Sequence, residues 1–117
     1  MIAIYIKATD EISYAIIGED TLHGMQQLVG GHIEIVRPIN LPRPYVMIVN
    51  EEGLLRDLPI NNTGALLYQG VIVGNVLILK EGLNEDGEPD LRSLDDGEAH
   101  ELLDELVERF PFLEVPA

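Results

Sequence analysis

The sequence predicts an α+β domain: a mainly antiparallel sheet of four to six strands, one short helix, and a C-terminal amphipathic acidic helix packed on one face. Three observations support this fold class. Short runs rich in β-branched and aromatic residues recur through the first 80 residues, as is typical of strands. At Gly30–Gly31 the apolar repeat changes from helical to alternating. From residue 93 a helical repeat returns, with acidic residues on its polar side.

The first strands and the first helix follow from residue type. Residues 1–7 and 12–17 are rich in isoleucine, alanine and tyrosine and flank a short polar turn, so we expect a hairpin. Asp20 or Thr21 can cap the helix that follows. The apolar side of this helix carries Leu22, Met25, Leu28 and Val29. Gly30 suits the left-handed residue that ends a helix.

Two further strands are expected at 32–37 and 45–49, on either side of a proline-rich connection. Prolines 38, 42 and 44 cannot sit in a central strand, so this connection should be a loop of restricted shape. After the second strand, Asn50 is expected to hydrogen-bond the backbone of a turn and Gly53 to take a positive φ.

One more strand should complete the centre of the sheet. After a second constrained loop, Asn62 or Thr63 can cap a single helical turn through Tyr68. The stretch 71–79 is the most apolar of the chain, and we expect one central strand there with a bulge at Gly74–Asn75. This stretch is too short to span a membrane.

The last third of the chain is electrostatically different. Residues 81–117 hold thirteen of the 21 acidic residues and two of the seven basic ones, so they carry −11 of the net −14. Within them, 81–92 is polar and turn-rich and is expected to be a mobile acidic loop. Ser93 should then open a helix over 93–110, with Asp96 in the capping-box position.

The polar side of this helix is a candidate partner-binding surface. It carries seven carboxylates: Asp95, Asp96, Glu98, Glu101, Asp104, Glu105 and Glu108. Along the helix axis they amount to about one negative charge per ~3 Å, roughly half the linear charge density of duplex DNA. Such a surface attracts basic proteins.

Several function classes are disfavoured by composition and motif. The chain has no cysteine, which excludes disulfides and thiolate metal sites. Its three histidines are scattered, and no metalloprotease, nucleophile-elbow or phosphate-loop motif is present, so no catalytic residue, metal or cofactor is predicted. The acidic balance disfavours direct binding to nucleic acid or membranes. The apolar run at the start is neither a secretory signal nor a spanning helix, so we expect a cytoplasmic protein.

Four segments of the body resemble a known family in their order and spacing. These segments are 28–36, 49–61, 65–68 and 72–76. Together they resemble the small phage and mobile-element proteins grouped as domain of unknown function 3846. The resemblance covers about residues 20–80, would also account for the N-terminal strands, and leaves the acidic third as a separate addition. The resemblance implies a phage or mobile-element origin and a fold shared with the family. It implies no activity, ligand or catalytic residue.

These observations favour a non-enzymatic protein-interaction or inhibitor module whose acidic helix meets a basic protein. A second hypothesis places a small ligand at the glycine and asparagine loops and treats the acidic tail as solubilising. The candidate ligand-binding residues are Gly30, Gly31, Glu34, Asn50, Glu51 and Asn61. If the protein were an enzyme whose site is assembled from residues distant in sequence, the polar side chains expected in that site are Glu34, Asn50, Glu51 and Asn61. A third hypothesis attributes the charge to a saline cytosol.

Overall fold

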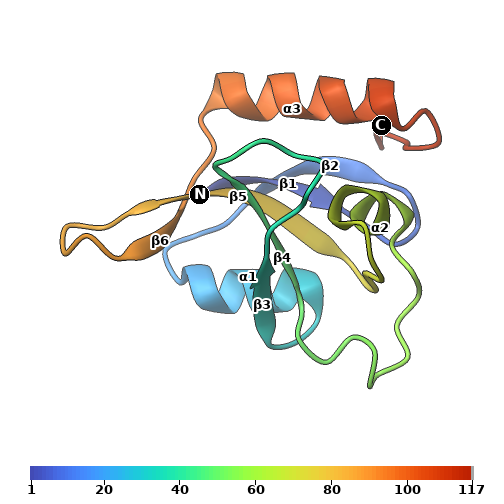
Figure 1. Cartoon of the computed structure of the whole chain (residues 1–117), viewed down its shortest axis with the longest axis horizontal. Helices are drawn as coiled ribbons and strands as arrows, with labels where there is room; N and C mark the ends of the chain where they lie inside the picture. Colours follow the sequence, from blue (N-terminus) through green and yellow to red (C-terminus); the bar gives the residue numbers. More distant parts are fainter. Residues whose placement is uncertain (117) are drawn as a thin grey trace.

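The computed structural model describes residues 1–116, and within them it contains a six-stranded antiparallel sheet and three helices (Figure 1). In chain order the elements are β1 (Ile2–Ile6), β2 (Ile12–Ile16), α1 (Thr21–Val29), β3 (Ile33–Val36), β4 (Tyr45–Asn50), α2 (Asn62–Tyr68), β5 (Val76–Leu83), β6 (Pro89–Arg92) and α3 (Asp96–Arg109). The predicted α+β class and antiparallel sheet are confirmed.

Strand β5 is the centre of the sheet, whose order is β2-β1-β5-β4-β3 with β6 also paired to β5. Its first half lies between β1 and β4, and its second half pairs with β6. Val76 and Ile78 pack in the cluster that includes α3, whereas Leu77 and Leu79 pack in the cluster that includes α1. Because both faces of β5 are buried, its apolar run is continuous rather than alternating.

Helices cover both faces of the sheet. Figure 1 shows α3 on one side and α1 on the other. Helix α1 follows its prediction closely: Asp20 is the N-cap, and Gly30 ends the helix with φ 83°. Helix α2 spans seven residues, where a single turn was expected, and its N-cap is Asn61 rather than Asn62 or Thr63.

The expected central strand at 71–79 begins later than predicted, at Val76, and continues past the predicted end to Leu83. The preceding residues leave the sheet to meet the loop before α2. Val73 bridges Ile60, and the Gly74 N–H donates to the carbonyl of Pro59 at 2.7 Å. Gly74 has φ 78°, a left-handed conformation. It separates the bridge at Val73 from β5, where a bulge within one strand was expected.

The segment 81–92, expected as a loop, is mostly a β-hairpin. Strands β5 and β6 pair from Lys80 opposite Arg92 to Leu83 opposite Pro89. Only the turn between them matches the expectation, and the Asn84 side chain closes it by accepting two backbone N–H groups. The hairpin projects from the body of the domain (Figure 1), so its residues are mostly exposed and lack the apolar alternation that identifies a strand.

The turn after β4 confirms one expectation and corrects another. The Asn50 side chain accepts the N–H of Glu52 at 2.8 Å, as predicted. Gly53, however, is not among the residues with positive φ, and Asp57 takes the left-handed conformation in this segment, with φ 56°. Gly53 is needed for space, because a Cβ there would lie 2.6 Å from Val73 Cγ2.

Candidate functional site

Helix α3 carries the acidic surface, and it begins later than the sequence suggested. Asp95, rather than Ser93, is its N-cap, and Glu98, rather than Asp96, completes the capping box. The Asp95 side chain accepts the Glu98 N–H at 2.7 Å, and the Glu98 carboxylate accepts the Asp95 N–H at 3.0 Å. Ser93 stays outside the helix, where its hydroxyl oxygen accepts the N–H of Ile2 and ties the chain to β1.

The apolar side of α3 is packed against the sheet. Its buried residues are Ala99, Leu102, Leu103 and Leu106, and Leu106 is fully enclosed. These residues recur at the helical period and belong to the same core cluster as Ile4 and Ile78. The sheet therefore fixes which side of α3 faces outward.

Four carboxylates lie on the outward side, almost opposite the buried residues. They are Glu101, Asp104, Glu105 and Glu108, here called the acidic stripe. Their spacing of i, i+3, i+4 and i+7 places them in one row over two helical turns. All four are exposed. Asp104 lies 3.3 Å from His100, and within residues 1–116 the other three carboxylates make no ion pair.

The other three acidic residues of the predicted surface have different surroundings. Asp95 and Glu98 are engaged in the capping box, and Glu98 also accepts a hydrogen bond from Lys80 of β5 at 2.7 Å. Asp96 is exposed in the first turn, where a negative charge is favourable beside the positive end of the helix dipole. Of the seven carboxylates, therefore, three support the start of the helix.

The Lys80–Glu98 pair joins α3 to the centre of the sheet. The hydrogen bond from Lys80 lowers the pKa of Glu98, and the same bond raises the pKa of Lys80. Burial, followed by the nearby Glu98 carboxylate, raises the pKa of Tyr45, which stands opposite Lys80 on β4. The pair is thus a local electrostatic link between helix and sheet.

Glu98→Gln should destabilise the protein at neutral pH, because glutamine can retain the capping bond but loses the charge paired with Lys80. Since the folded-state pKa of Glu98 lies below 4.5, its contribution is complete above pH 4.5 and is lost as the pH falls through that lowered pKa. The contribution of Lys80 is lost only as the pH rises through a pKa above 10.5. Urea unfolding at a series of pH values should show the two proteins converging in acid. A difference that stays constant below pH 4.5 would contradict this assignment.

The structure separates the six candidate residues of the body. Gly30, Gly31 and Asn50 lie together, because the Asn50 amide donates to the carbonyl of Val29 at 3.1 Å and a Cβ on Gly31 would lie 3.0 Å from that amide nitrogen. This contact holds the end of α1 against β4. Glu34 and Glu51 are exposed and share a pocket with Asn50, whereas Gly30 lines a different pocket.

Asn61 is fully buried and lines neither of these pockets. Its side-chain oxygen accepts the N–H of Gly64 at 2.9 Å, and its amide donates to the carbonyls of Ile6 and Gly74, both at 3.0 Å. All three bonds join parts of the protein's own backbone. The geometry therefore assigns Asn61 to the internal framework that holds α2, β1 and the start of β5 together.

Sequence reasoning missed a pocket beside the proline-rich loop between β3 and β4. Arg37, Arg43, Tyr45 and Glu81 are among the residues that line it. The available signal was the dipeptide Arg-Pro at both ends of the loop, at 37–38 and 43–44. Glu81 could not be associated with it, since the contact spans 44 positions in sequence.

Other kinds of site find little support in the described part of the chain. Residues 1–116 contain no group of three or more histidine, aspartate or glutamate side chains placed to hold a metal ion. None of the helices described is long and apolar enough to cross a membrane.

The fold and this surface define a small α+β protein that presents an acidic helix on one side of its sheet. The chain belongs to the family described as "Domain of unknown function (DUF3846)", whose model matches residues 1–109. The expectation that the resemblance stops near residue 80 is wrong, because the match includes α3. The acidic helix is thus part of the family's domain and not a separate addition.

No curated protein matches the chain. Among solved structures, the chain is similar to the small RNA methyltransferase HEN1, with a TM-score of 0.57 and 13% sequence identity over 88% of this chain. The match spans only 16% of the methyltransferase chain. At this identity the likeness concerns the fold alone.

Proposed function

We propose that this protein is a non-enzymatic interaction or inhibitor module that binds a basic surface of a partner protein through the acidic stripe. The observation that carries this proposal is the row of four exposed carboxylates on α3: within residues 1–116 none lies at ion-pair distance from a lysine or arginine, and only Asp104 has a histidine, His100, at that distance. The phage and mobile-element setting implied by the family resemblance suits a small module that acts on a host protein.

The acidic stripe has a cost in stability that the protein's own contacts do not offset. Like charges three or four positions apart repel each other by about 0.2–0.5 kcal/mol per pair. Glu105 and Glu108 also lie toward the C-terminal end of α3, where negative charge is unfavourable to the helix dipole. Carboxylates arranged at such a cost support a role outside the chain.

The packing of α3 also favours binding. Its buried side and capping box fix the rotation of the helix, so the stripe is presented in one orientation. Binding of a partner with lysine or arginine at matching positions would then carry a small entropy cost for ordering this surface. Complementary charge also raises the rate of encounter at low salt.

Neutralising the stripe should stabilise the folded protein. The variant Glu101→Gln, Asp104→Asn, Glu105→Gln and Glu108→Gln removes four repulsive pairs and should raise the free energy of unfolding by about 1–2 kcal/mol. Urea unfolding at low salt measures this change, and added salt should reduce it. A loss of stability would show that these carboxylates support the fold, which would count against the proposal.

The same variant tests binding, and it leaves Asp95 and Glu98 in place so that α3 keeps its cap. Its matched control removes four exposed carboxylates elsewhere, through Glu19→Gln, Glu85→Gln, Asp86→Asn and Glu88→Gln. Both variants therefore have the same net charge. In a pull-down from host lysate, we expect wild type and control to capture a basic protein that the stripe variant does not. Equal capture by all three proteins would contradict the proposal and favour a small-ligand site with a solubilising tail.

A further inference from the structure

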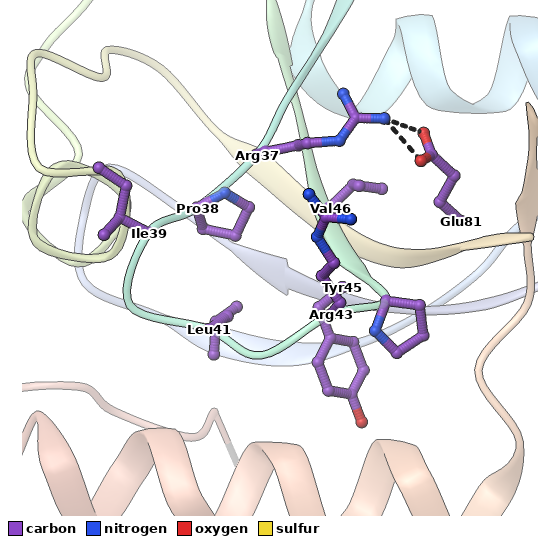
Figure 2. A pocket seen from close by; sticks show the side chains of 9 residues that line it. Arg37, Pro38, Ile39, Leu41, Arg43, Tyr45, Val46 and Glu81 are labelled. Atoms are coloured by element: carbon purple, nitrogen blue, oxygen red, sulfur yellow. Dashed lines mark hydrogen bonds and ion pairs between the residues drawn. The ribbon is translucent and has the colours of Figure 1, made fainter.

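The pocket beside the proline-rich loop has the size of a small-molecule site. Its volume is about 720 Å³, and its lining comes from the loop, from the start of β4 and from Glu81 of β5 (Figure 2). Small-ligand pockets commonly measure about 300–1,000 Å³ and combine apolar walls with a few polar groups. Here the apolar lining includes the buried residues Leu41 and Val46 and also Ile39, which is 69% exposed.

Two guanidinium groups are among the polar groups that line the pocket. Arg37 directs one nitrogen, Nη2, to both carboxylate oxygens of Glu81, at 2.6 and 2.7 Å (Figure 2). Its other side-chain nitrogens donate to no other described residue. The Arg43 guanidinium makes no hydrogen bond or ion pair with any residue of 1–116. Because each guanidinium offers five N–H donors, the pair retains ample capacity for an incoming oxyanion.

The loop that carries these arginines is held in place before any ligand arrives. Asn40, in the middle of the loop, donates its backbone N–H to the carbonyl of Leu67 at 2.9 Å and its side-chain amide to that of Leu66 at 2.8 Å. Arg109 of α3 donates to the Asn40 carbonyl at 3.1 Å. Anchoring to two helices lowers the ordering cost of binding.

The charge of this pocket is opposite to that of the protein as a whole. A chain with net charge −14 has only seven basic residues, yet two of them line this one pocket. The carboxylate of Glu81 already accepts hydrogen bonds from Arg37, as the carboxylate of a ligand would. Glu81 thus marks the chemistry that Arg37 can recognise and competes with a ligand for it.

We propose that the pocket lined by Arg37 and Arg43 binds a small organic oxyanion, a carboxylate or phosphate group attached to an apolar body. Arg43 is the main contact to the anion, and Arg37 joins it as Glu81 is displaced. The apolar body rests against Leu41 and Ile39. This site is independent of the acidic stripe, so either proposal can fail without the other.

Nuclear magnetic resonance titration with phenyl phosphate, benzoate and inorganic phosphate at low salt tests the site. We expect saturable shifts of backbone amides in 37–46 and at Glu81, with phenyl phosphate or benzoate binding more tightly than inorganic phosphate. Comparing the two aromatic probes shows which anionic group is preferred. Arg43→Gln should weaken binding about 10- to 100-fold, as expected for loss of a hydrogen bond to a charged group.

Two further variants make the outcome decisive. Glu81→Gln removes the competing carboxylate and should tighten binding severalfold, a gain that misfolding could not produce. Arg56→Gln, which removes an arginine from a different pocket, is the matched control and should leave the affinity unchanged. The proposal is overturned if none of the probes gives saturable shifts, or if Arg43→Gln binds as tightly as Arg56→Gln.

Discussion

Asn61→Ala is expected to lower the free energy of unfolding by about 3–5 kcal/mol, the largest effect of any single polar substitution considered for this chain. Alanine would leave three enclosed backbone groups without their partner: the N–H of Gly64 and the carbonyls of Ile6 and Gly74. It would also remove the cap of α2. Each of these groups costs about 1–3 kcal/mol when buried without a hydrogen bond.

Urea unfolding of Asn61→Ala measures this effect, and Asn62→Ala is its matched control. Asn62 is the next residue and the same amino acid, but it is exposed, and its side chain makes only one long contact, of 3.5 Å, to Asp10. The control should change stability by about 0.5 kcal/mol or less. If both variants lose the same stability, Asn61 does not hold the framework as described.

Leu106→Ala should cost about 2–5 kcal/mol, with a value in the upper half of that range because the site is closed on all sides. Leu106 is 0% exposed and packs in the core between α3 and the sheet. The substitution removes apolar contact and leaves a cavity that the rigid sheet beneath cannot readily fill. The result should be a weaker attachment of α3 to the sheet.

Leu55→Ala is the control for this substitution, since Leu55 is 89% exposed and the same atoms are removed. Its effect on unfolding should be close to zero. Hydrogen exchange of the α3 amides should accelerate in Leu106→Ala more than that of β4, if the helix opens locally. Equal stability of the two variants would show that α3 is not docked as the structure has it.

Apolar patterns were sufficient to predict most of the fold. Strand β4 and the apolar part of β5 bury both of their faces, and α1 and α3 repeat at the helical period, so their signals are strong. The β5–β6 hairpin gave no such signal, because its pairing is made by backbone bonds between mostly exposed polar residues. The late start of β5, at Val76 instead of residue 71, depends on the bridge between Val73 and Ile60, a tertiary contact.

The candidate site was only partly predictable, because its details depend on where α3 begins and on contacts between residues distant in sequence. The number of acidic residues near α3 is evident from composition, but the division into a capping group and a stripe depends on where the helix begins. Asn50 and Asn61 look alike in sequence as polar residues beside turns, and only the structure shows that both are buried with their side chains bonded to the protein's own backbone. The arginine pocket requires the register of β4 against β5, which brings Glu81 to the loop.

The most direct test of the central claim is the affinity of the captured partner for three forms of this protein: wild type, the stripe variant and the control of equal net charge. Titration calorimetry with the purified partner at low and high salt supplies the values. We expect the stripe variant to bind about tenfold or more weakly at low salt, the control to bind nearly as tightly as wild type, and the difference to shrink with added salt. Equal weakening in both variants would contradict the claim, because it would mean that net charge, and not the acidic stripe of α3, determines binding.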